Sequence, residues 1–272
     1  MKFLSFLRVL PALFNYRRID EDQKRLTFRR EMWMDGIQVM AARETDASDQ
    51  GLYTAMKGGH NLESHNHNDV GHFVVYADGL PVLIDVGVEE YSAKTFSAQR
   101  YEIWTMQSAY HSLPTINGCM QQDGSEFRAV EAHYELSEDR TQLTLNLAGA
   151  YPQEAGIASW IRCCRLLRSP QAAIELEERY AFAGETDCRF SLNFMTCCEP
   201  AIEADGRIVL QRGGQPALLM EYDAAQFAAV AETIPLEDKK LRNSWGACLY
   251  RIVLQPTALQ QEGRHTIRFR QA

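Results

Sequence analysis

The sequence predicts a mostly β protein, a large antiparallel β-sandwich preceded by a short helical segment. Two observations support this fold class: apolar and polar residues alternate over many short runs, and turn-forming residues separate those runs. Alternation is clearest at residues 130–136, 143–147 and 267–269. Many short strands joined by tight turns are typical of sandwiches, so residues 31–272 are expected to form one β-sandwich domain.

The first 30 residues have a different pattern. Apolar side chains recur at helical spacing from Phe3 to Phe14, Pro11 interrupts them, and a charged stretch follows at residues 17–25. Arg8 divides the apolar run and no small-residue cleavage site follows, so we expect a short helix rather than a signal peptide. Its apolar face is expected to pack against a helical partner or a second copy of the chain.

Turn residues and prolines mark the expected strand ends. The Asp78-Gly79 pair predicts a two-residue hairpin in which paired positions sum to 157, so that Asp85 would lie opposite His72. Residues 87–110 are too long for an ordinary hairpin loop, and such insertions often carry function. Further turns are expected at Asp205-Gly206, Gly213-Gly214 and Gly263, and strand ends at Pro152, Pro170, Pro200, Pro216 and Pro256.

Composition excludes several classes of protein. Of the 272 residues, 46% are hydrophobic and 24% charged, which is ordinary for a globular protein and excludes a disordered chain. No run approaches about 18 consecutive apolar residues, so no membrane-spanning helix is expected. The formal net charge of −8 argues against a general nucleic-acid binder. The seven cysteines show no Cys-x-x-Cys spacing, which predicts packed thiols rather than a zinc knuckle or a disulfide framework.

Five of the seven histidines fall within residues 60–111. His65 and His67 are two apart, so on an extended strand both imidazoles would face the same side. The predicted hairpin brings Asp85 back toward the histidine strand. Together with Asp85 and His111, the two histidines offer the ligand types that a zinc-like ion accepts. A His-x-His pair by itself is more often two surface or hydrogen-bonded histidines, and the sequence leaves both interpretations open.

Three runs in a fixed order resemble a known family. They are Lys57–Asn61 continuing through His65–Phe73, then Pro81–Asp85, then Tyr110–Gly118. Together they resemble the heparinase II/III-like family of polysaccharide lyases over about residues 33–118. The resemblance implies a β-sandwich that follows an α/α toroid, with an active cleft between the two. It also implies a carbon–oxygen lyase that acts on the uronate of an acidic polysaccharide by β-elimination.

The resemblance also implies roles for single residues. His65 matches the catalytic histidine of the sandwich, whereas His67, Asp85 and His111 match the ligands of a structural metal ion, which we expect to be zinc. The toroid's catalytic tyrosine and its asparagine or histidine partner have no counterpart here. Residues 1–30 are therefore expected to be a remnant or linker of a toroid, and activity to be incomplete without that domain.

Three residues near the histidines are candidate substrate contacts. Arg100 could grip a uronate carboxylate through two hydrogen bonds, and Tyr101 and Tyr110 could stack on sugar rings or donate protons. A solvated arginine and two packed tyrosines are the simpler alternatives.

Two other functions remain open at this stage. The spacing Gly59-x5-His65-x-His67-x4-His72-x6-Gly79 fits a cupin metal motif, with His72 where a glutamate is usual, and would indicate a metal-dependent small-molecule enzyme. A non-catalytic carbohydrate-binding sandwich is the second alternative. The family resemblance suggests a bacterial periplasm or cell envelope, but the location is left open because no clear signal peptide is present.

Overall fold

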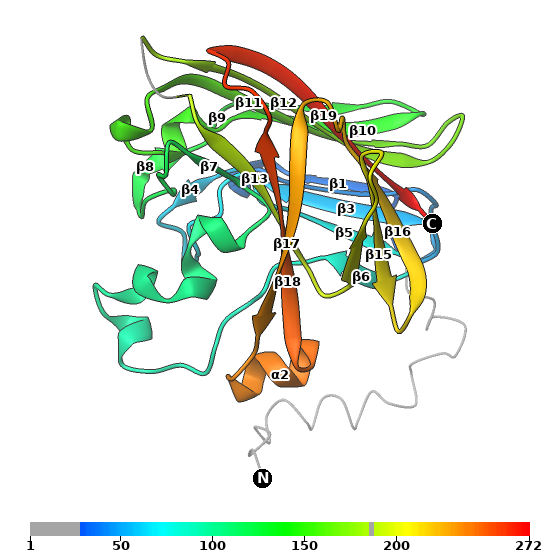
Figure 1. Ribbon diagram of the computed structural model, residues 1–272, viewed down its shortest axis with the longest axis horizontal. Coiled ribbons are helices and arrows are strands. Elements are labelled where there is room, and N and C mark those ends of the chain that lie inside the picture. The colour runs from blue at the N-terminus through cyan, green and yellow to red at the C-terminus, as the bar shows by residue number, and fades with distance from the viewer. Residues whose placement is uncertain (1–27, 185–187) are drawn as a thin grey trace, which may run out of the picture.

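The computed structural model describes residues 28–184 and 188–272, which form two large antiparallel sheets packed face to face (Figure 1). The nine-stranded sheet follows the order β1-β2-β3-β5-β6-β13-β18-β17, with β7 paired to β13. Its strands are β1 (Glu31–Met34), β2 (Val39–Arg43), β3 (Leu52–Lys57), β5 (Phe73–Ala77), β6 (Leu80–Leu83), β7 (Pro114–Ile116), β13 (Phe190–Thr196), β17 (Phe227–Pro235) and β18 (Cys248–Pro256).

The eight-stranded sheet follows the order β14-β15-β16-β19-β12-β11-β10-β9. Its strands are β9 (Val130–Leu136), β10 (Arg140–Asn146), β11 (Ile157–Leu167), β12 (Ala173–Phe182), β14 (Glu199–Ile202), β15 (Arg207–Arg212), β16 (Gln215–Glu221) and β19 (Glu262–Gln271). A small third sheet pairs β4 (His60–Asn61) with β8 (Gly124–Arg128).

The described helices are short. They are η3 (Asp35–Ile37), η4 (Lys94–Phe96), η5 (Arg100–Glu102), η6 (Trp104–Met106), η7 (Ser108–Tyr110), η8 (Ala148–Ala150), η9 (Gln153–Ala155) and α2 (Lys239–Trp245). Four of the 3-10 turns, η4 to η7, fall in the long insertion at residues 87–110. No helix among the described residues is long and apolar enough to cross a membrane. The helix predicted in the first 30 residues lies almost entirely outside the described residues.

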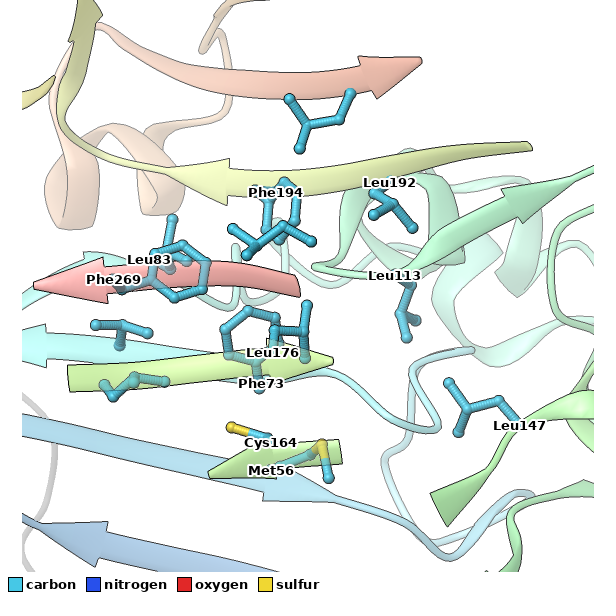
Figure 2. Packing of buried hydrophobic residues seen from close by; sticks show 14 of the residues in the cluster. Met56, Phe73, Leu83, Leu113, Leu147, Cys164, Leu176, Leu192, Phe194 and Phe269 are labelled. Carbon is cyan, nitrogen blue, oxygen red and sulfur yellow. The ribbon is translucent and has the colours of Figure 1, made fainter. Parts of the chain in front are cut away.

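The core lies between the inner faces of the two sheets. Phe73 and Phe194 come from the nine-stranded sheet and Phe269 from the eight-stranded one, and Figure 2 shows the three rings together. Their ring centroids are 5.9 Å (Phe73–Phe269) and 6.1 Å (Phe194–Phe269) apart, and all three are fully buried. Burying one such side chain contributes about 1.5–3 kcal/mol, so these rings help to hold the sheets together. The predicted antiparallel sandwich is confirmed.

The hairpin predicted at Asp78-Gly79 joins β5 to β6. Both turn residues have positive φ, +50° and +75°, as a type I′ turn requires. The predicted register holds for Tyr76 opposite Pro81, but a bulge then shifts the pairing by one residue. Since β6 ends at Leu83, the prediction that Asp85 pairs opposite His72 within a ladder is wrong.

Three turn and strand-end predictions are wrong. Gly263 lies inside β19, where a Cβ atom would be 2.6 Å from the Tyr180 hydroxyl oxygen of the neighbouring β12, so glycine leaves room for the Tyr180 side chain. Pro200 lies in the edge strand β14, and Pro216 lies near the start of β16 beside a bulge. Edge strands and bulges are the places where a sheet accepts a residue without an N–H donor. No disulfide bond joins any of the seven cysteines, all of which lie among the described residues.

Candidate functional site

His67, Asp85 and His111 come together from three separate segments of the chain. Their ligand atoms all lie within 4.8 Å of one another. His67 Nδ1 is 3.1 Å from His111 Nε2, and His111 Nε2 is 3.6 Å from Asp85 Oδ2. Both histidines are buried, whereas the Asp85 carboxylate is partly exposed. The structure thus places the three predicted ligand residues in one cluster, while the metal itself stays a prediction.

The donor set of this cluster fits a zinc-like ion. His111 Nδ1 lies 2.9 Å from the Gln107 carbonyl oxygen and donates to it, so the Nε2 lone pair of a neutral ring faces the cluster. In a tetrahedral zinc site with bonds of 2.0–2.1 Å, ligand atoms are about 3.3 Å apart. The two shortest separations in the cluster lie close to that value. Two imidazoles and one carboxylate leave a fourth position for water or another ligand.

The loop that carries the histidines does not lie in a strand and is held by side chains and by backbone hydrogen bonds, such as that from the Asn68 N–H to the Met106 carbonyl oxygen at 3.0 Å. The prediction that His65 and His67 lie on an extended strand is wrong: β4 ends at Asn61, and His65 has a left-handed φ of +61°. Lys57 Nζ donates to the Asp69 carboxylate at 2.7 Å and so holds the part of the loop that follows His67.

Two buried amides, neither of them predicted as a site residue, also hold this loop. The Asn61 side chain accepts from the Asp69 N–H at 3.2 Å. Gln121 accepts from the Val70 N–H at 3.0 Å and donates to the Val70 carbonyl at 2.7 Å. These contacts join positions up to 51 residues apart, and no local sequence pattern marks them.

His72 lies against the cluster but does not present a ligand atom to it. Its Nδ1 accepts from the Ser112 N–H at 2.9 Å, so a neutral ring carries its proton on Nε2. That Nε2 atom is 3.9 Å from Asp85 Oδ2 and has no hydrogen-bond partner among the described residues. The His72 Nε2 atom thus faces Asp85 at a distance too long for a hydrogen bond.

The charges in the cluster influence one another. Burial, with His111 nearby, lowers the pKa of His67 and lowers that of His72 to about 3. Burial also lowers the pKa of His111, but the hydrogen bond and charge of Asp85 outweigh it and raise that pKa. Burial would raise the pKa of Asp85, yet hydrogen bonding to His111 and attraction to the imidazoles hold it well below its usual range. A metal ion binds a charged carboxylate beside neutral imidazoles, so binding must displace the proton that Asp85 favours on His111.

His65, the predicted catalytic residue, is exposed on the same loop. Arg100 Nη2 donates to the carbonyl oxygen of Asn66 at 2.8 Å, and Nη1 donates to that of Thr95 at 3.1 Å. The Tyr101 hydroxyl donates to the Asn66 side-chain oxygen at 3.1 Å. Two of the three predicted substrate contacts thus hold the residue that separates His65 from His67.

Tyr110, the third predicted substrate contact, is packed. Its ring meets Trp104 edge to face, with centroids 5.0 Å apart, and the Arg251 guanidinium lies over it at 4.7 Å. Ile84, Leu241 and other apolar residues form the cluster around it. Tyr110 is therefore a packed tyrosine in the structure, which was the simpler alternative to a substrate contact.

Comparison with known proteins decides the family. The model of the heparinase II/III-like C-terminal domain matches residues 36–269. The chain belongs to this family. Among solved structures, the heparan sulfate lyase HepC from Pedobacter heparinus is 16% identical, with a TM-score of 0.71 over 98% of this chain and 40% of that one. A heparinase III gene product is 12% identical, with a TM-score of 0.70 over 97% and 40% of the two chains.

These likenesses establish the fold of this heparinase II/III-like domain. The chain spans about 40% of the length of both of these proteins. A search of curated protein sequences found no significant match. The family and the two-sheet fold also show that the cupin interpretation is wrong, since that motif belongs to a small barrel. In addition, His72 Nδ1 is engaged by Ser112, and exposed His65 is not part of the ligand cluster.

Proposed function

We propose that the chain is the β-sandwich part of a carbon–oxygen lyase that cleaves uronate-containing polysaccharide by β-elimination. One observation carries the proposal: exposed His65 lies two residues before buried His67 of the His67–Asp85–His111 cluster in a chain of this family. One of its structural relatives is a lyase of heparan sulfate, an acidic polysaccharide, and that substrate class is the one we propose.

In this proposal the cluster and the exposed histidine have different tasks. His67, Asp85 and His111 would hold a zinc-like ion, which supplies structural rigidity to the loop. An imidazole can take up or release a proton near neutral pH, and His65 would do so at the reacting sugar. The hydrogen bonds from Arg100 and Tyr101 to Asn66 would limit the movement of His65.

We further propose that a helical toroid domain completes the active site. β-Elimination needs neutralisation of the carboxylate, a base for the C5 proton and an acid for the leaving oxygen. His65 can serve one of these roles, whereas the Arg100 and Tyr101 side chains already bind Asn66. A positioned acid–base group is typically worth about 10²–10⁴ in rate, so the sandwich without its partner should be nearly inactive.

The test is the ultraviolet absorbance of the unsaturated uronate product. Heparan sulfate, chondroitin, hyaluronate and alginate are each assayed with the chain alone and with the chain joined to a toroid domain. We expect turnover only with the toroid, and a loss of about 10²-fold or more in His65→Ala. The matched control is His133→Ala, which removes another exposed histidine, on β9.

Three outcomes would contradict the proposal. Turnover that survives His65→Ala would remove this residue from the mechanism. Full turnover by the chain alone would refute the need for a toroid. Saccharide binding without turnover, even with the toroid present, would favour the non-catalytic carbohydrate-binding alternative.

A further inference from the structure

A buried ion pair lies beneath the histidine cluster. Arg162 of β11 and Glu178 of β12 face each other across the two strands and point into the sandwich, with 1% and 0% of their side chains exposed. Arg162 Nε donates to Glu178 Oε1 at 2.8 Å, and Nη2 donates to the same oxygen. The carboxylate is held in turn by Trp160, whose indole N–H donates to Glu178 Oε2 at 2.8 Å.

The remaining nitrogen of Arg162 contacts both segments that carry buried site histidines. Nη1 donates to the Gly71 carbonyl oxygen at 2.9 Å and to the Ser112 carbonyl oxygen at 2.6 Å. Gly71 directly precedes His72, and Ser112 directly follows His111. The Ser112 N–H in turn donates to His72 Nδ1. One guanidinium group therefore joins the eight-stranded sheet to both segments.

We propose that Arg162, held in place by Glu178, is a positioning residue that sets the separation of the His67–His72 loop from the His111 segment. This inference rests on the proposed metal centre, whose geometry depends on that separation. Groups that orient metal ligands from outside commonly change metal affinity about 10–100-fold when they are removed.

The chemistry of the pair supports positioning over simple packing. A buried ion pair can often be replaced by apolar residues without loss of stability, so a contribution to stability does not by itself explain the presence of the Arg162–Glu178 pair. The planar guanidinium can bind a carboxylate with one edge and two carbonyl oxygens with another, which the single ammonium of lysine cannot do. The two carbonyl groups lie in the interior, where an unpaired acceptor is costly.

The experiment removes the guanidinium without leaving a buried charge. Arg162→Met is combined with Glu178→Gln, so that a side-chain oxygen still accepts from Trp160. The control is Arg165→Met: Arg165 lies three residues along β11 on the outer face, where it binds Glu175 and Glu177. Zinc affinity is measured by competition with a chromophoric chelator. We expect about 10–100-fold weaker binding in the double variant and no change in the control.

A second measurement does not depend on metal. Long-range ¹⁵N–¹H NMR spectra of metal-free protein report which nitrogen of His72 carries the proton. We expect protonated Nε2 in the unsubstituted chain and in Arg165→Met, and mixed tautomers in the double variant. If the double variant does not fold, Arg162→Lys is measured instead, because lysine keeps the positive charge but lacks the planar guanidinium and its several N–H donors.

The outcomes separate this inference from the proposed metal centre. If the unsubstituted chain binds no zinc, the metal centre is refuted, and the His72 tautomer still tests whether Arg162 positions the histidines. If zinc affinity and the His72 tautomer are both unchanged in the folded Arg162 variant, Arg162 is a packing residue and the inference is wrong.

Discussion

His65 and His67 are separated by one residue but have opposite environments. The backbone turns at His65 through a left-handed conformation, which leaves its ring exposed, while His67 points inward and meets His111. Asn66 between them is held by Arg100 and Tyr101. This arrangement places an exposed histidine next to a buried one, as the two roles proposed for the histidines require.

The first prediction concerns the metal ligands. We expect purified protein to contain about one zinc-like ion per chain, and His67→Ala to contain less than a tenth of that, because only Asp85 and His111 remain of the three protein ligands. Elemental analysis after gentle purification measures both. His133→Ala, on the outer surface, should retain the ion. Equal metal content in His67→Ala and the unsubstituted chain would refute the assignment.

A second prediction concerns Gln121, which fixes the loop from a distance. In Gln121→Leu the N–H and carbonyl groups of Val70 lose their partners in a buried place. An unsatisfied buried group costs about 1–3 kcal/mol, so the free energy of unfolding should fall by about 2 kcal/mol or more. Urea denaturation measures it. Gln122→Leu, an exposed neighbour, is the control, and an equal effect of both substitutions would contradict this role of Gln121.

Whole strands were more predictable than the loop that carries the site. Alternation marked the strands because one face of each packs against the opposite sheet, as Phe269 does on β19. The Asp78-Gly79 turn was predictable because its backbone geometry demands these residue types. The shape of the loop at residues 62–72 was not, since Lys57 and Gln121 hold it from positions that no periodicity connects.

The cluster was predictable only in part, for a related reason. Residue type and the family resemblance indicated His67, Asp85 and His111, although the strand geometry assumed for them was wrong. Asp85 reaches the cluster beyond the end of β6 rather than through a ladder. The role of Arg162 could not be predicted from the sequence. An arginine in a strand is expected to be exposed unless its carboxylate partner on the next strand, here Glu178, is known.

Gly263 provides a prediction at the level of the strand pair. In Gly263→Ala the added Cβ would lie 2.6 Å from the Tyr180 hydroxyl oxygen and 2.7 Å from its Cζ atom, so the Tyr180 ring, which packs against Trp160 and Phe190, must move. Overpacking of this kind typically costs about 1–3 kcal/mol of stability. Thermal unfolding measures the loss. Gly36→Ala, which meets nothing within 4 Å, is the matched control, and equal melting temperatures would show that Tyr180 moves aside freely.

The charge of the whole chain limits how it can bind substrate. Its formal net charge is −8, whereas the proposed polysaccharide is itself anionic. The two basic groups that contact the histidine loop directly through Asp69 and Asn66 are engaged: Lys57 binds Asp69 and Glu63, and Arg100 binds two carbonyl oxygens. Repulsion between exposed charges is screened beyond about 8 Å at physiological salt, so local cations decide the affinity. This is a second reason to propose that a partner domain contributes to binding.

The last prediction concerns metal removal and the stability of the whole domain. The cluster joins the segments at His67, Asp85 and His111, so an ion bound there would stabilise the folded state and little else. With free zinc at a thousandfold excess over Kd, the stabilisation is about 4 kcal/mol. At about 2–4 °C per kcal/mol for a domain of this size, a chelator should lower the melting temperature by about 10 °C.

Calorimetry with and without chelator measures this shift, and the binding site can be checked independently. In His67→Ala the two melting temperatures should coincide, and both should lie near that of the chelated unsubstituted chain. The Arg165→Met variant, altered on the outer face, should respond to the chelator as the unsubstituted chain does. A zinc-loaded chain whose melting temperature is insensitive to chelator would place the ion outside this cluster, since an ion bound by these three segments cannot be removed without loosening their attachment to one another.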